Sequence, residues 1–157
     1  MNRGALWPMV FVMLALSVAA HFGAFSPSAP AAGTVAGSLD EGACADLLRG
    51  LAAGVLGQDD ALLRQHLHPA LLGQMAKDRP LWAQMRDGLP EPAVLRRFER
   101  ARFEVLGVGT DAAGALEGAR GQRQARLVVH LGEGATFAKV VRAAPHDGRW
   151  RFLGLGD

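Results

Sequence analysis

The chain has 157 residues, of which 17 are basic and 15 are acidic, so the formal net charge at pH 7 is only +2. This near-balance argues against a nucleic-acid-binding protein, which usually has a clear basic excess. The single cysteine cannot form an internal disulfide. No serine follows Ser38, which excludes a serine nucleophile from the rest of the chain.

The first expected element is an apolar segment at residues 6–25, which follows Arg3; positions 4–39 contain no charged residue. Its 20 residues are about the length that a helix needs to cross the ~30 Å hydrocarbon core of a bilayer. Two interpretations remain open, a cleaved signal peptide and a signal anchor whose N-terminus stays in the cytoplasm. Both predict membrane contact through residues 6–25 and export. We therefore expect a domain that is anchored in the inner membrane, or released by cleavage, and that lies in the periplasm or outside the cell.

The rest of the chain divides into a linker and one domain. Residues 26–39 are rich in Ala, Gly, Pro and Ser and are predicted to form a flexible tether. Residues 40–157 are long enough for one domain with its own core. Cys44 lies some twenty positions beyond the apolar segment, so we reject lipid attachment and expect a buried cysteine on a helix face.

Helices are expected in the first half of the domain. Residues 40–56 place apolar side chains at helical spacing, and Asp59 is a suitable cap for a second helix over residues 60–66. Pro69 interrupts this pattern. Shorter helical segments are expected at residues 70–76 and 81–87, and residues 93–100 form either a last helical turn or the entry to a sheet.

Strands are expected in the second half, at residues 103–108, 125–131, 136–143 and 149–155, with a possible weak strand at 115–119. Glycine-rich turns at residues 132–134 and 146–148 favour hairpins. The predicted fold class is therefore α+β, with an N-terminal transmembrane or signal helix followed by short helices on a curved antiparallel sheet of three to four strands.

A register follows if Leu131 faces Thr136 and a four-residue turn over 145–148 joins the last two strands. One face of the sheet would then carry Leu127, Val129, Leu131, Val140, Leu153 and Leu155. The other face would carry a candidate ligand pocket or interface made of Val128, His130, Phe137, Val141, Trp150 and Phe152. Because one helical layer covers only one face, the second apolar face is expected to curve into a pocket, or to bind a ligand or a partner chain.

A family resemblance rests on two stretches, the Gly57-Gln58-Asp59-Asp60 junction that leads into residues 61–69 and the C-terminal stretch at 147–152. Together with the order of the elements, they resemble the nuclear transport factor 2-like (cystatin-like α+β) superfamily in its exported bacterial form. The resemblance implies a cone-like fold with an open pocket and frequent dimerisation through the sheet. The superfamily includes ketosteroid isomerase-like enzymes, many non-catalytic binding domains, and periplasmic scaffold subunits of type IV secretion systems. No residue matches a catalytic position of the enzymes, and the chain has no tyrosine to act as an oxyanion donor.

The remaining candidate residues are histidines and arginines. His130 is the one catalytic candidate; it is interpreted either as a polar group on a pocket floor or as a partly buried histidine that is hydrogen-bonded to the backbone. His66 and His68 are expected at a solvated helix end, and no metal or cofactor is expected. The cluster of Arg96, Arg97, Arg100 and Arg102 is interpreted as a solvated face or as a contact for anionic lipid or an acidic partner.

The expected function is a membrane-tethered extracytoplasmic binding or scaffold domain that binds a partner protein or a small ligand without catalysis. One alternative is an isomerase- or dehydratase-like enzyme that uses His130 as a base. Another is a subunit of an envelope complex that works by oligomerising. The expected partners are the membrane and, through the sheet, a second copy or an envelope protein; no nucleic acid is expected.

Overall fold

The computed structural model describes residues 37–110 and 115–156, and these form an α+β domain in which the helices precede the strands. The helical elements are α2 (Glu41–Leu56), α3 (Asp60–His66), α4 (Pro69–Gln74), α5 (Leu81–Arg86), α6 (Pro92–Leu95) and the 3₁₀ helix η1 (Arg96–Glu99). The strands are β1 (Arg102–Gly109), β2 (Arg123–Gly132), β3 (Ala135–His146) and β4 (Arg149–Gly156). Neighbouring strands are antiparallel, and the sheet order is β1-β2-β3-β4. The predicted fold class is confirmed for this part of the chain.

The predicted N-terminal signal or anchor helix, and most of the predicted tether, lie outside the described residues. Within 37–110 and 115–156, none of the helices combines the length and the apolar character that a membrane span requires.

The long helix α2 forms as its sequence predicts. The side chain of Asp40 caps it by accepting a hydrogen bond from the amide of Ala43, with an Oδ1–N distance of 2.9 Å. The apolar stripe of α2 is buried, and Cys44 on that stripe is 0% exposed, which confirms the prediction of a buried cysteine.

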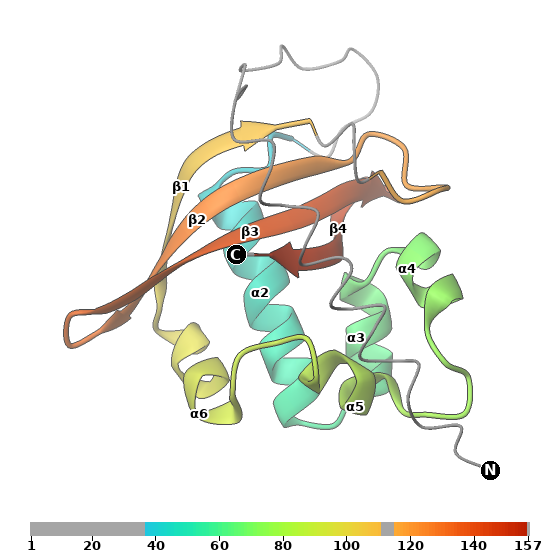
Figure 1. Cartoon of the computed structure of the whole chain (residues 1–157), viewed down its shortest axis with the longest axis horizontal. Coiled ribbons are helices and arrows are strands. Elements are labelled where there is room, and N and C mark those ends of the chain that lie inside the picture. The colour runs from blue at the N-terminus through green and yellow to red at the C-terminus, as the bar shows by residue number, and fades with distance from the viewer. Residues whose placement is uncertain (1–36, 111–114, 157) are drawn as a thin grey trace.

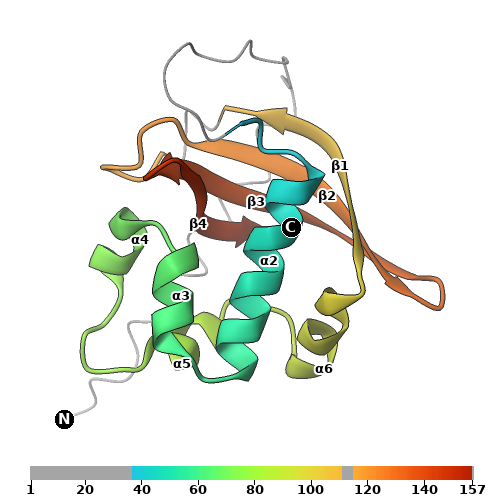
Figure 2. The same ribbon diagram turned by 180° about the vertical axis from the view of Figure 1, so that it is seen from behind.

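All the helices lie on one side of the sheet, and the strands curve over them (Figure 1). Seen from behind, α2 runs beneath the sheet with α3 at its side (Figure 2). The core between these two layers takes Leu48 and Leu51 from α2, Leu63 from α3, and Val129 and Val141 from the sheet. The second half of the chain thus supplies one apolar sheet face, which the first half covers.

The pairing of β2 with β3 differs from the predicted register by one residue. The turn pairs Gly132 with Ala135, as the prediction requires, but a bulge at Leu131 then shifts the ladder, so that His130 faces Thr136 and Val129 faces Phe137. Because side chains alternate across a strand, a shift of one residue moves every later partner to the other face. The predicted pairing of Leu131 with Thr136 is therefore wrong.

The pairing of β3 with β4 also differs. The turn has two residues, Asp147 and Gly148, whose φ angles of 50° and 72° are those of a tight hairpin. The strand β3 therefore extends to His146, where a four-residue turn was expected. A second bulge, at Leu153, makes Val141 face Leu155.

Together the two bulges gather the apolar side chains on the helix-facing side. This face holds Phe103, Leu127, Val129, Phe137, Val141, Ala143, Phe152 and Leu155. The outer face carries Glu104, Arg126, Val128, His130 and Val140 among its residues, and is mixed in character. The expectation of a second, substantially apolar face is wrong, because the sequence pattern gave no sign of the bulges.

The possible strand at 115–119 is not formed, and these residues make an irregular turn. Ala119 packs with Ala144 and Leu153 in a small second apolar cluster, which Leu71 of α4 also contacts. This cluster holds α4 against the C-terminal half of the sheet.

Candidate functional site

The six residues predicted to form a pocket or interface are divided between the two faces of the sheet. Val128 and His130 lie on the outer face, whereas Phe137, Val141, Trp150 and Phe152 lie on the helix-facing side. Val141 and Phe152 are 0% and 3% exposed and belong to the core. The indole Nε1 of Trp150 is buried without a hydrogen-bond partner among the described residues. The structure therefore does not bring the six residues together into one site.

His130, the catalytic candidate, takes part in a charged cluster on the outer face. Its Nε2 lies 2.8 Å from Oε2 of Glu104 and 3.3 Å from Nη2 of Arg102. The His130 side chain is 28% exposed, and Glu104 is 44% exposed. These side-chain contacts join β2 to its neighbour β1.

Within the arginine cluster of residues 96, 97, 100 and 102, Arg97 makes hydrogen bonds to the sheet. Arg97 donates from Nη2 to the carbonyl oxygens of Leu131 and Gly132, both at 3.1 Å, and so ties η1 to the β2–β3 hairpin. Its Nη2 also lies 3.8 Å from Oε2 of Glu133.

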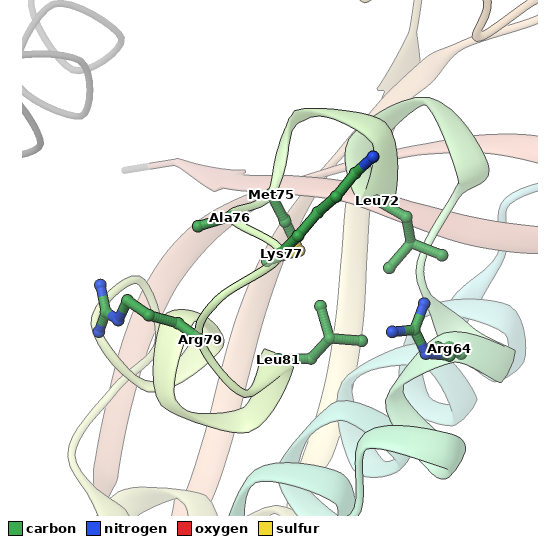
Figure 3. A pocket seen from close by; sticks show the side chains of 7 residues that line it. All are labelled: Arg64, Leu72, Met75, Ala76, Lys77, Arg79 and Leu81. Carbon is green, nitrogen blue, oxygen red and sulfur yellow. The ribbon is translucent and has the colours of Figure 1, made fainter.

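A pocket lies on the helical side of the domain, between α3, α4 and α5 (Figure 3). Its volume is about 280 Å³, close to the ~300 Å³ at which small-molecule sites begin. The lining consists of Arg64, Leu72, Met75, Ala76, Lys77, Arg79 and Leu81. Figure 3 shows the side chain of Leu81 between Arg64 on one side and Arg79 on the other, with Leu72 above Arg64 and Met75 above Leu81.

The charges of this lining all have one sign. Three of its side chains are cationic, from Arg64, Lys77 and Arg79, and none is a carboxylate. Arg79 turns away from the apolar floor (Figure 3) and pairs with Asp87 at 3.3 Å. Arg64 and Lys77 make no ion pair within residues 37–110 and 115–156. The pocket thus combines an apolar floor with two uncompensated positive charges at its rim.

A carboxylate from α3 fixes the α5 wall of the pocket. Asp60 accepts hydrogen bonds from the backbone amides of Leu81 and Trp82, which begin α5. Asp59 caps its own helix α3 through the amide of Leu62, as the sequence predicts. Asp60 caps a different helix, α5. As a result, Leu81 is held in the pocket at 4% exposure.

A buried glutamine fixes the loop between α4 and α5. Gln84 is 4% exposed, and its side chain makes three hydrogen bonds of 2.9 Å. Its Oε1 accepts from the amide of Ala76, and its Nε2 donates to the carbonyl oxygens of Ala76 and Arg79. These bonds hold the stretch that carries Lys77 at the rim.

A histidine fixes the α4 wall. His68 is 4% exposed, so the expectation that it lies at a solvated helix end is wrong. Its Nδ1 accepts a hydrogen bond from the amide of Ala70 and thereby caps α4, which provides Leu72. The difference arises because the chain turns at Pro69 against β4, where the His68 amide donates to the Phe152 carbonyl.

Sequence reasoning missed this site. Its cations and apolar residues belong to separate short helices and a loop, with no shared periodicity. The adjacent pair Asp59-Asp60 was the one signal of extra capping, and nothing marked Gln84 as a residue that orders a loop. No group of three or more His, Cys, Asp or Glu among the described residues is placed to hold a metal ion.

No family model matches this sequence, and searches of curated proteins and of solved structures also find no match.

Proposed function

We propose that this chain is a membrane-tethered, extracytoplasmic domain that binds a small amphiphilic anion without catalysing a reaction. The ligand has an apolar body of a few carbon atoms and a carboxylate, sulfonate or phosphate head. The tether and the export rest on the apolar residues 6–25 and on the linker after them. Membership of the nuclear transport factor 2-like superfamily remains a proposal, supported by the order of short helices and antiparallel strands.

The lining of the α3–α4–α5 pocket carries the proposal. Arg64 and Lys77 are exposed and make no ion pair among the described residues, and an anion that binds between them gives each a charge-assisted partner. An apolar ligand body would cover the floor formed by Leu72, Met75 and Leu81, and removing this apolar surface from water would favour binding. A neutral ligand would make only the apolar contacts with the floor, and a cation would be repelled by the positive charges at the rim.

The non-catalytic part of the proposal rests on the residue types in the lining. Arg and Lys can bind and orient an anion, but the pocket lining includes no histidine or carboxylate to transfer a proton. His130 does not line this pocket.

The test compares three eight-carbon probes that differ in their head group: octane-1-sulfonate, octan-1-ol and octylamine. Calorimetric titrations use the full-length chain in nanodiscs of zwitterionic lipid, with empty nanodiscs as the blank. We expect octane-1-sulfonate to bind more tightly than octan-1-ol, and octylamine not to bind. Equal binding of all three probes, or no binding of the sulfonate, would contradict the proposal.

Variants locate the binding. Arg64→Gln and Lys77→Gln should each weaken octane-1-sulfonate binding by about tenfold, because a hydrogen bond to a charged group contributes roughly 1.5–3 kcal/mol. Arg120→Gln is the charge-matched control, since Arg120 is exposed and does not line the pocket. A loss of affinity as large in Arg120→Gln would show that only net charge matters.

A further inference from the structure

Each wall of the pocket is held by one polar side chain, and only one of the three can change its charge near neutral pH. Asp60 caps α5 and Gln84 holds the loop, while His68 caps α4. An imidazole titrates between about pH 5 and 8, which neither a carboxylate nor an amide ordinarily does.

The hydrogen bond that His68 makes requires a neutral ring. Its Nδ1 lies 3.1 Å from the amide nitrogen of Ala70 and accepts that proton, so the ring proton resides on Nε2. Protonation would place a second proton on Nδ1, which then faces the Ala70 amide as another donor. The cap cannot survive this change in the observed geometry.

The surroundings of His68 also oppose a positive charge. The ring of His146, at the end of β3, meets it edge-on with centroids 5.4 Å apart, and Arg151 acts on it from β4. The helix α4 has no charged side chain that could stabilise a protonated His68. The last residue of α3 is His66, another imidazole and not a carboxylate. Burial, followed by His146 and Arg151, lowers the pKa of His68 from its ordinary value of 6.5. The Nε2 of His146 lies 3.2 Å from Oδ2 of Asp147.

The consequence reaches the ligand site because α4 is short. It has six residues, and the amides of Leu71 and Leu72 bond to the carbonyl oxygen of His68. A helix of this length is not stable alone and depends on its cap and its packing. Leu72 on α4 and Met75 at its end both line the pocket.

We propose that His68 makes the pocket pH-sensitive: protonation of its ring removes the cap of α4, loosens the wall that carries Leu72 and Met75, and releases the bound anion. The release part rests on the proposed function, whereas the loosening of α4 does not. The sign follows from the lowered pKa. The folded wall holds the neutral ring, so its stability is complete above pH 6.5 and decreases as the pH falls through the pKa of the folded state.

Two measurements on the full-length chain in nanodiscs test this proposal between pH 7.5 and 5.0. The first is hydrogen exchange of the peptide that covers α4, corrected for the intrinsic pH dependence of exchange. The second is binding of octane-1-sulfonate, whose head group stays ionised throughout. In the wild type, protection of α4 should fall by up to about tenfold per pH unit between pH 6.5 and the lower pKa of His68 in the folded state, and the affinity should fall with it.

The variant His68→Asn separates the cap from the titration. Asparagine accepts a hydrogen bond at an N-cap but does not titrate in this range. Both pH dependences should therefore disappear in His68→Asn, while binding at pH 7.5 persists. In His146→Gln the decline should begin at a higher pH, because a charge that opposes protonation of His68 has been removed.

The proposal is overturned if protection of α4 in the wild type is constant over this range, or if His68→Asn shows the same decline. If His68→Asn does not fold, NMR titration of the His68 ring in the wild type decides, since its midpoint must mark the lower end of the pH range over which protection is lost. If octane-1-sulfonate binds at no pH, the proposed function and the release fail, but the exchange measurement still decides whether His68 controls α4.

Discussion

The carboxylate of Asp60, in the first turn of α3, accepts a hydrogen bond from the backbone amide of Leu81, with an Oδ2–N distance of 3.0 Å. Its other oxygen, Oδ1, lies 2.9 Å from the amide nitrogen of Trp82. Asp60 and Leu81 are 21 positions apart in the chain. One side chain therefore fixes the relative position of two helices that both border the pocket.

Removal of this carboxylate should loosen the α5 wall. We expect Asp60→Ala to lower the free energy of unfolding by about 2 kcal/mol, because two amides lose their partner. Asp59→Ala, which removes a cap within α3 alone, should cost about 1 kcal/mol. Urea denaturation measures both losses. Octane-1-sulfonate binding should weaken in Asp60→Ala and not in Asp59→Ala; equal effects would contradict a special role for Asp60.

Replacing the Nε2 donor of Gln84 by a hydrogen-bond acceptor should destabilise the domain. In Gln84→Glu the shape is kept, but two carboxylate oxygens replace the amide that donates to the carbonyls of Ala76 and Arg79. We expect a loss of about 2–4 kcal/mol in the free energy of unfolding, because acceptors face acceptors in a buried site. Thermal denaturation at pH 7 measures this loss. The exposed Gln74→Glu is the control, and a loss of less than about 0.5 kcal/mol in Gln84→Glu would contradict this account.

Alanine at two helical glycines should have opposite effects. A Cβ at Gly54 of α2 would lie 2.6 Å from Cδ2 of Leu63, which is 0% exposed and cannot move aside. We expect Gly54→Ala to destabilise the domain by about 1–3 kcal/mol through overpacking. At Gly73 of α4 nothing lies within 4 Å of an added Cβ, so Gly73→Ala should stabilise by about 0.5–1 kcal/mol. Chemical denaturation measures both, and stabilisation by Gly54→Ala would show that α2 and α3 are not in this close contact.

The thiol of Cys44 should be unreactive in the folded protein. Burial, with the nearby Asp40 and Glu41, raises its pKa from 9.0 to about 12. The thiolate is the reactive form, and it is scarce at pH 8. We expect 5,5′-dithiobis(2-nitrobenzoic acid) to label Cys44 only when urea unfolds the domain, as followed by absorbance. Rapid stoichiometric labelling in native buffer would place Cys44 outside the core.

The export proposal has a direct test in bacteria. Alkaline phosphatase, which is active only after export, is fused after Asp157 and compared with a fusion that lacks residues 1–25. We expect activity in the first fusion and none in the second, because the apolar segment directs export. Immunoblotting of membrane and soluble fractions then separates an anchor from a cleaved signal. Equal activity of the two fusions would refute a role for residues 1–25 in export.

Several features set by neighbouring residues were predicted correctly, although the length of the β3–β4 turn was not. The capping of α2 by Asp40 and of α3 by Asp59 spans three positions in each case. The positive φ angles of Gly132 and Gly134 belong to the turn in which these residues stand. The helical spacing of the apolar stripe on α2, which begins with the buried Cys44, is equally local. For this reason the order of helices and strands could be predicted from the sequence.

Features that depend on distant partners were not predicted. The bulges at Leu131 and Leu153 decided which face of the sheet Phe137 and Phe152 occupy, and alternation alone gives no sign of a bulge. This register is favoured because it places the apolar side chains of the sheet against α2.

The sequence by itself determined the fold class, the caps of α2 and α3 and the positions of the glycine-rich turns, since each depends on contacts within a few residues. Only the tertiary structure decided that Arg64 and Lys77 border one pocket, and that Asp60, Gln84 and His68 hold its walls. Hydrogen bonds and packing between segments far apart in the chain set these positions, and no periodicity in the sequence records them.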